Sequence, residues 1–313
     1  MFRFFMPEKP EDPREKLRIL KTQIDDLLNS EALNDIFDLL DVDKKSIVQR
    51  FNKRSMDGNA VREVQTLPPL TVSESVRNDL FPCFKELGFI DINRPLNKTP
   101  DRILILGGSL KACFDRTAAA AGMISDRTLS IDGLSCYRPI NPVERVAASF
   151  SSACETEFGA MSEAFIRFFG TDSCRWKEDF HGDRNLNRIS CIRTLNGVSE
   201  NHIFRIFAAP SEEPGLRRAD TGDTLVHYLQ SASPGPDETL LGVTGNRYCN
   251  RQFLQLAFVT MSLWKKGHPV PVRIDVTGCN SDDRTDTVET YDPGHYLQEL
   301  IALLDWADRL QQL

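Results

Sequence analysis

The sequence predicts an α/β protein with a mainly parallel sheet and helices on both faces. From Arg102 onward, apolar runs of strand length alternate with longer segments of helical periodicity. Each apolar run ends in small or polar residues, mostly with a glycine. The 313 residues suffice for one large α/β domain and an extension.

The clearest unit is a strand, a glycine turn and a helix within residues 102–122. The apolar segment RILIL stops at Gly107, Gly108 and Ser109, and a helical segment with an alanine run follows. Such a unit opens a Rossmann-like sheet. Its turn exposes backbone N–H groups at a helix N-terminus, where an anion is stabilised, and Arg116 can add a full charge.

We expect about five strands, because five apolar runs are separated by helical patterns. The strands are expected at 102–106, 128–132, 203–208, 239–244 and 272–277. The helices are expected at 109–121, 143–169, 221–231, 247–266 and 293–311. Residues 171–201 do not fit this alternation. We interpret them as an insertion that contains a hairpin, since RISCIRTL is strand-like and Asn196-Gly197 is a turn signal.

Residues 1–70 are predicted to form a helical extension with a linker, ahead of an α/β domain at 71–313. Apolar residues recur at helical spacing within residues 14–53, and Ser30 offers an N-cap. Residues 55–70 are interpreted as the linker.

Composition excludes several classes of protein. With 38 basic and 45 acidic residues the net charge is −7, which argues against broad nucleic-acid binding. No apolar run is long enough for a transmembrane helix. The apolar start MFRFFM is too short for a signal peptide, so we expect it to pack on the body of the protein. Weak contact with a membrane surface is the alternative.

The eight cysteines form no CxxC pair, so free thiols in a reducing compartment are expected. These features favour a cytoplasmic protein, with secretion by a route that needs no signal peptide as the alternative. Cys249 is interpreted as an inert thiol, because no histidine is near it in sequence.

Candidate ligand-binding residues follow the predicted strands, because open parallel sheets bind ligands beyond the C-terminal ends of their strands. Arginines at a helix N-terminus oppose the helix dipole, so those near residue 248 are better explained by an anionic ligand or by buried carboxylates. The candidates are Gly107, Gly108, Ser109, Arg116, Arg138, Thr221, Asp223, Asn246, Arg247, Tyr248 and Arg251.

Three glutamates are candidates for a general base or for orienting the arginines: Glu144, Glu155 and Glu157. Each has a structural alternative. Glu144 can pair with Arg138 to order its loop, after Asn141 as the N-cap of a helix. The other two glutamates can serve only the helix dipole.

Other candidates have structural alternatives too. Asp223 can belong to the cap of a helix that begins at Asp220 or Thr221. Arg116 can form a surface ion pair with Asp115 or Asp126.

The order of the motifs resembles the YdcF/SanA/ElyC-like family of uncharacterised α/β proteins. The similar segments are the strand with its GGS turn, RPINPVE at 138–144, ETE at 155–157, RRADTGDT at 217–224 and LLGVTGNRYCNRQ at 240–252. The resemblance covers residues 88–280. It implies a bacterial protein with a Rossmann-like sheet, a cleft fed by these segments and an adenosine-containing ligand such as S-adenosylmethionine.

We therefore expect a protein that binds a small anionic, nucleotide-like ligand at the C-terminal strand ends, with hydrolase or transferase activity left open. S-adenosylmethionine or another nucleotide is the expected cofactor. The alternative is a protein-interaction or secreted regulatory factor that uses the N-terminal helices or the 171–201 insertion as its working surface. A metal-dependent hydrolase using Asp282, Asp283 and Asp286 is a third hypothesis. That acidic stretch lacks the spacing of a calcium loop and is interpreted as a solvated loop.

Overall fold

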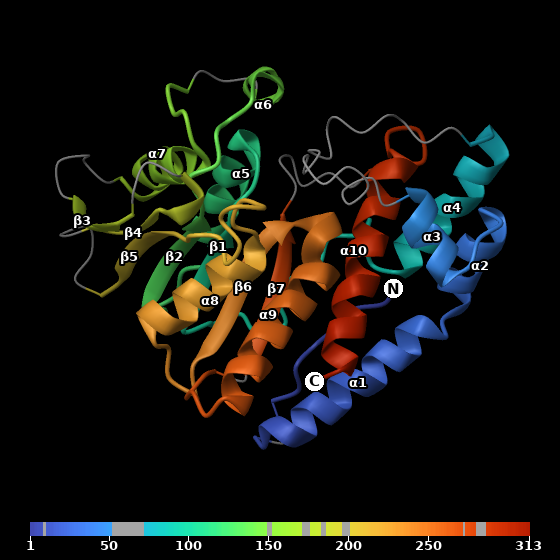
Figure 1. Cartoon of the computed structure of the whole chain (residues 1–313), viewed down its shortest axis with the longest axis horizontal. Helices are drawn as coiled ribbons and strands as arrows, with labels where there is room; N and C mark the ends of the chain where they lie inside the picture. The colour runs from blue at the N-terminus through green and yellow to red at the C-terminus, as the bar shows by residue number, and fades with distance from the viewer. Residues whose placement is uncertain are drawn as a thin grey trace.

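A seven-stranded sheet runs through the centre of the protein (Figure 1). The computed structural model describes residues 1–8, 11–51, 72–148, 152–170, 176–182, 186–195, 201–271, 273–279 and 286–313. The strands are β1 (Arg102–Leu106), β2 (Ser130–Ser135), β3 (Trp176–His181), β4 (Ser190–Leu195), β5 (Ile203–Ala208), β6 (Thr239–Gly245) and β7 (Arg273–Cys279). Their order across the sheet is β3-β4-β5-β2-β1-β6-β7.

Five of these strands, β1, β2, β5, β6 and β7, are parallel to one another, and they are the five that the sequence predicts. The mainly parallel sheet is therefore confirmed, but the expected number of about five strands is wrong. Strands β3 and β4 form an antiparallel hairpin that adds to the edge of β5. All but the first residue of β3 are exposed, so its sequence lacks the apolar run of a buried strand. The turn signal Asn196-Gly197 lies outside the described residues.

The strand order places β1 between the two halves of the parallel sheet. From β1 the chain proceeds to β2 and β5 on one side, then returns to β6 and β7 on the other. Connections that leave the C-terminal ends of β1 and β6 therefore diverge toward opposite sides. In open α/β sheets, this is the position at which ligands bind.

The helices begin and end close to the predicted positions. They are α1 (Pro13–Leu28), α2 (Glu31–Leu39), α3 (Lys44–Phe51), α4 (Glu74–Glu86), α5 (Leu110–Ala121), α6 (Pro142–Ala147), α7 (Glu157–Phe169), α8 (Thr221–Ala232), α9 (Cys249–Lys265) and α10 (Pro293–Gln311). Two short 3-10 turns are η3 (Leu186–Arg188) and η4 (Asn246–Tyr248).

One expected helix, at 143–169, is two helices. The chain leaves the helical path after α6, and Thr156 forms a bridge with Pro139 before α7 starts. Thr156 is the N-cap of α7, because its hydroxyl accepts a hydrogen bond from Gly159 N–H at 3.1 Å. The sequence periodicity alone does not reveal this interruption.

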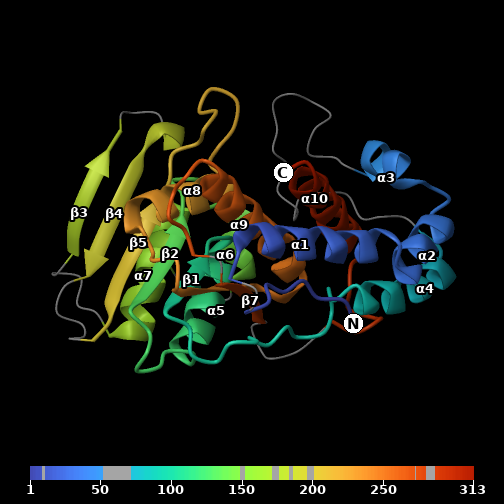
Figure 2. The same cartoon turned by 90° about the horizontal axis from the view of Figure 1, so that it is seen from below.

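Helices cover both faces of the sheet, as predicted. Helices α5 and α7 contact one face, and α8 and α9 contact the other, as Figure 2 shows for α5 against α8 and α9. The side chains of β1 alternate between the two layers: Ile103 and Ile105 lie in the core under α5, and Leu104 and Leu106 in the core under α9.

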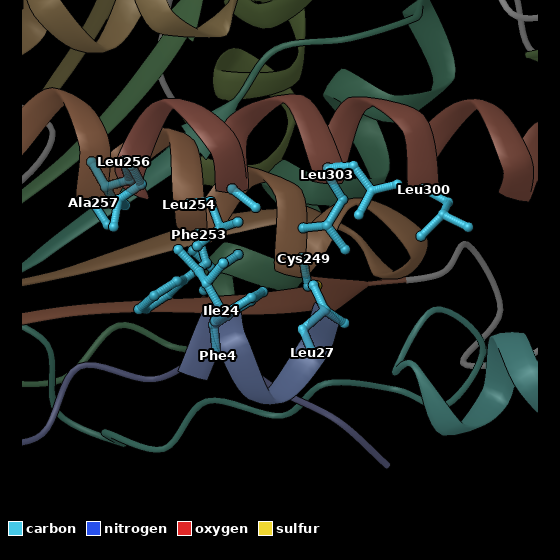
Figure 3. Close-up of a cluster of buried hydrophobic side chains, with 14 of the residues drawn as sticks. Phe4, Ile24, Leu27, Cys249, Phe253, Leu254, Leu256, Ala257, Leu300 and Leu303 are labelled. Atoms are coloured by element: carbon cyan, nitrogen blue, oxygen red, sulfur yellow. The ribbon is translucent and has the colours of Figure 1, made fainter. Parts of the chain in front are cut away.

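The N-terminal helices α1–α4 gather beside α10 and share the core of the α9 face (Figure 1). In Figure 3, Ile24 and Leu27 of α1 point toward apolar side chains of α9 and α10. Phe4 is 1% exposed, and its ring stacks on Phe253 with centroids 6.2 Å apart. The start of the chain therefore packs on the body of the protein, as expected.

Within the part of the chain that the structure describes, every helix is too short or too polar to cross a membrane. The expected linker at 55–70 lies outside the described residues.

Candidate functional site

The turn after β1 is held by two side-chain oxygens at the N-terminus of α5. Ser109 is the N-cap, and its hydroxyl accepts a hydrogen bond from Ala112 N–H at 3.3 Å. The Leu110 N–H donates to Glu144 Oε2 at 2.9 Å. The Glu144 carboxylate of α6 thus already interacts with the positive end of the α5 dipole.

Arg116 extends from α5 to the C-terminal end of β1. Its Nη1 donates to the carbonyl oxygens of Leu106 at 2.7 Å and Gly107 at 2.5 Å. The residue is 4% exposed, and its Nε has no hydrogen-bond partner among the described residues. The surface ion pair considered from the sequence is not formed, since Asp115 pairs with Lys111 at 2.8 Å and Arg116 faces the sheet.

Two glycines leave room for the Arg116 guanidinium. A Cβ on Gly108 would lie 3.2 Å from Arg116 Nη1, and one on Gly245 would lie 3.6 Å from Nη2. Gly108 follows β1, and Gly245 ends β6. The guanidinium therefore lies between the ends of the two neighbouring strands where the sheet order reverses.

Arg138 joins the β2 side of the site to the β1 turn. Its Nε donates to Glu157 Oε2 at 2.6 Å, its Nη1 donates to Glu144 Oε1 at 2.7 Å, and its Nη2 donates to the Gly108 carbonyl. All three charged side chains are buried. The pairing of Arg138 with Glu144 is thus confirmed, as is Asn141 as the N-cap of α6, and Glu157 belongs to the same network.

Glu157 is the second buried carboxylate of this network, after Glu144. Burial raises its pKa, while the charges of Arg138, Arg218 and Arg116 oppose that shift. A Cβ on Gly107 would collide with Glu157 Oε1, so the absence of a side chain lets the turn approach this carboxylate. The Glu157 carboxylate therefore lies directly beside the β1 turn.

Tyr248 is surrounded by three arginines. The Cζ atoms of Arg116, Arg247 and Arg251 lie 5.7, 5.4 and 5.6 Å from the centroid of its ring. These are cation–π distances, and the tyrosine is partly exposed. The Tyr248 ring therefore lies next to Gly245 at the end of β6, to Arg116 at the end of β1 and to Arg251 in the first turn of α9.

The three arginines differ in their charge partners. Arg251 Nε donates to Glu299 Oε2 at 2.6 Å, so a buried carboxylate explains this arginine, as the sequence allowed. For Arg116 and Arg247, no carboxylate oxygen of the described residues lies within 4.0 Å. Charges farther away still act on Arg247: Tyr248, Tyr296, Glu299 and Asp286 raise its pKa, and burial opposes that shift.

Several predicted residues have structural partners instead. The Asn246 amide donates to the carbonyls of Ile90 at 2.9 Å and Asp91 at 2.6 Å, and its Oδ1 accepts from Asn93 N–H at 2.7 Å. The Glu155 side chain is exposed, and its carbonyl accepts from Ile140 N–H at 2.8 Å.

The N-terminus of α8 carries its own cap. Asp220 and Asp223 form a capping box, and Asp223 accepts a hydrogen bond from Arg217 Nη1 at 2.5 Å. Thr221 is the first residue of the helix, and its carbonyl accepts from the Thr224 hydroxyl at 3.0 Å. The structural alternative for Asp223 is thus confirmed, and its carboxylate is used by the cap and by Arg217.

Sequence reasoning left four contributors out of the site. Gly245 and Arg218 belong to segments that follow predicted strands. Only the fold brings Gly245 next to Arg116 and the charge of Arg218 near Glu157. Glu299 and Tyr296 come from α10, and Tyr296 places its ring centroid 5.8 Å from Arg247 Cζ. No sequence signal links α10 to the first turn of α9.

Metal and thiol chemistry receive no support from the described residues. Among them, no group of histidine, cysteine, aspartate and glutamate side chains is arranged to hold a metal ion. Asp282 and Asp283 lie outside the described residues, and Asp286 accepts a hydrogen bond from the Tyr296 hydroxyl at 2.6 Å. Cys249 is buried, and burial raises the pKa of its thiol, which agrees with an inert cysteine.

Comparison with known proteins returns no match to a protein-family model, to a curated protein or to a solved structure.

Proposed function

We propose that this protein is a Rossmann-like, YdcF-like protein that binds a small anionic, nucleotide-like ligand beside the C-terminal ends of β1 and β6. The observation that carries this proposal is the position of Arg116 and Arg247 around Tyr248 with no carboxylate of the described residues within 4.0 Å. An anion between them would offset the cost of holding both charges away from water.

The neighbouring ion-pair network supports the same position. Arg138 is matched by Glu144 and Glu157, so it orders the turn after β1. Glu157 is the candidate base for a hydrolase or transferase step, because it lies beside Gly107 and burial raises its pKa. Glu144 already accepts a backbone hydrogen bond of α5, which favours a positioning role for it.

Calorimetric titration with ATP, AMP and S-adenosylmethionine tests this function. We expect saturable binding of at least one of them by the unaltered chain. Arg247→Gln should weaken that binding about ten- to hundredfold, because a charge-assisted contact contributes about 1.5–3 kcal/mol.

Arg309→Gln is the matched control, since Arg309 is an exposed arginine of α10 that pairs with Asp305 at 3.0 Å. Its affinity should equal that of the unaltered chain. Saturable binding of none of the three compounds would refute the proposed function.

A further inference from the structure

We infer that strand β3 pairs edge to edge, in antiparallel orientation, with β3 of a second copy of this chain. The inference follows from three observations: the open edge of β3, the covered edge of β7 at the other end of the sheet, and the order of the charges along β3. It goes beyond the proposed ligand binding and does not depend on it.

Strand β3 is the outermost strand of the sheet, as Figure 2 shows. On one side it pairs with β4, and all its side chains from Lys177 to His181 are exposed. Within the part of the chain that the structure describes, its backbone pairs only with that of β4. Alternate backbone N–H and C=O groups of β3 therefore point away from the sheet, where another strand can bind them.

The opposite edge of the sheet is covered by the chain itself. Along β7, the Gly278 N–H donates to the Asn93 carbonyl at 2.8 Å, and Asp275 Oδ2 accepts from the N–H groups of Leu96 at 2.5 Å and Asn97 at 3.2 Å. Residues 93–97 thus protect that edge. Because only the β3 edge is open, pairing through it stops at two copies and gives a closed dimer instead of a fibre.

Symmetry restricts how two copies of β3 can meet. The twofold axis of such a dimer is perpendicular to the sheet, so each residue lies opposite a residue whose side chain is on the same face. A register is then defined by the residue that lies opposite its own copy. Residues that share a face alternate along the strand: Trp176, Glu178 and Phe180 on one face, and Lys177, Asp179 and His181 on the other.

The charges favour one register. With Glu178 opposite its copy, Lys177 faces Asp179 and Trp176 faces Phe180, and symmetry forms each pair twice. With Lys177 or Asp179 opposite its copy, two like charges meet at the centre, and no pair of opposite charges forms within β3. Registers centred nearer either end of the strand form fewer pairs. Opposite-charge and aromatic pairs stabilise neighbouring strands, so we assign the register centred on Glu178.

The two Glu178 carboxylates at the centre each bring a cation with them. Arg193 of β4 lies beside Glu178, with its Nε 2.8 Å from Oε1, and its Cζ lies 5.2 Å from the centroid of the Trp176 ring. Asp179 contacts His181 Nε2 at 3.0 Å, but these side chains are 67% and 74% exposed. Such an exposed contact contributes little, so Asp179 can turn toward Lys177 of the second copy.

Sedimentation equilibrium tests the dimer. The interface is small, because each copy contributes mainly one strand, so we expect a weak monomer–dimer equilibrium that is measurable up to about 500 µM chain. Lys177→Asp and Asp179→Lys should each weaken the dimer at least about tenfold, since two attractive pairs become repulsive. The double variant with both changes should restore it, because the opposite charges have only exchanged places.

Lys266→Asp is the matched control for a change of net charge. Lys266 is exposed at the end of α9, and its substitution should leave the dimer unchanged. Circular dichroism of each variant establishes that it is folded.

Cysteine substitutions along β3 test the register. Residues directly opposite each other in an antiparallel pair have Cα atoms about 4.5–5.5 Å apart, within the range of a disulfide. The copies of Lys177, and those of Asp179, lie on a diagonal and are farther apart than a disulfide spans. Mild oxidation with copper phenanthroline should therefore crosslink Glu178→Cys faster than Lys177→Cys or Asp179→Cys. The unaltered chain, which has its own free cysteines, gives the background.

Each failure has its own meaning. A chain that remains monomeric over the whole concentration range overturns the inference. A dimer that neither charge reversal weakens, or that the double variant does not restore, overturns its position at β3. Fastest crosslinking of Lys177→Cys or Asp179→Cys overturns the register centred on Glu178.

Discussion

Single residues decide where charge is tolerated in this protein. Asp132 is fully buried on β2, where it accepts hydrogen bonds from Arg205 Nε at 2.7 Å and from the Tyr228 hydroxyl at 3.1 Å. This charge is matched and belongs to the core under α8. Arg116 is nearly as buried, but its hydrogen bonds go only to backbone carbonyls, which is why we propose it and not Asp132 as a ligand-binding residue.

His227 should make stability depend on pH. Burial lowers its pKa, and its Nε2 is buried without a hydrogen-bond partner among the described residues. The unfolded chain therefore takes up a proton near pH 6.5 that the folded protein binds only at lower pH. The free energy of unfolding should consequently fall as the pH drops below about 6.5, by at most about 1.4 kcal/mol per pH unit from this residue.

Urea unfolding of the unaltered chain and of His227→Gln between pH 7.5 and 5.5 checks this dependence. The variant should lose part of the slope. His268→Gln is the control, because His268 is exposed, and its slope should match that of the unaltered chain. Identical slopes for the unaltered chain and His227→Gln would contradict the assignment.

At the scale of elements, the connection between β6 and α9 is tied to the segment before β1. The buried Asn246 side chain satisfies the backbone of residues 90–93 with both its amide and its carbonyl oxygen. The adjacent Gly278 has no side chain, which allows the Asn246 side chain to lie against β7. Three segments far apart in sequence are thus joined by one amide.

Asn246→Ala should loosen that junction. It leaves the Ile90 and Asp91 carbonyls and the Asn93 N–H without their partner, and each buried unsatisfied group costs about 1–3 kcal/mol. We expect a loss of at least about 2 kcal/mol in urea unfolding and faster hydrogen exchange at Asn93. Asn29→Ala removes an exposed hydrogen bond and should change stability by less than about 1 kcal/mol. Unchanged exchange at Asn93 would contradict the role assigned to Asn246.

The whole molecule has one continuous core on the α9 face, which includes the N-terminal helices. Leu20, Ile24 and Leu27 of α1 are completely buried in the same cluster as residues of α9 and α10. Their apolar stripe therefore faces the body of the protein and is not a free surface for a partner. The start of the chain adds to this packing, since Arg3 Nη2 donates to Asp275 Oδ1 on β7 at 2.7 Å.

Removal of residues 1–70 should consequently destabilise the α/β part. It would uncover apolar side chains of α9 and α10 and leave Asp275 without its Arg3 partner. We expect the truncated chain to aggregate or to unfold at a much lower temperature, as measured by circular dichroism and size-exclusion chromatography. A truncated monomer with the melting temperature of the full chain would show that the extension is independent.

Local sequence determined most of the elements. The bounds of β1, β5 and α10 are those expected, because buried parallel strands are short apolar runs and helices show their periodicity and caps. The N-caps Ser30 and Asn141 were also predictable, since a cap acts within three residues of itself. The glycine turn after β1 was likewise visible in the sequence.

Only the tertiary structure decided the partners of the charged residues. Arg251 and Glu299 are 48 positions apart, and their ion pair depends on how α9 packs against α10. Strand β4 pairs with β5 and β3 with β4, both antiparallel, because the backbone hydrogen bonds of a sheet edge need no apolar run. Periodicity records that one face of a segment is buried, but not what buries it. The fold alone therefore separates Arg251, which has a carboxylate, from Arg116 and Arg247, which have none within 4.0 Å among the described residues.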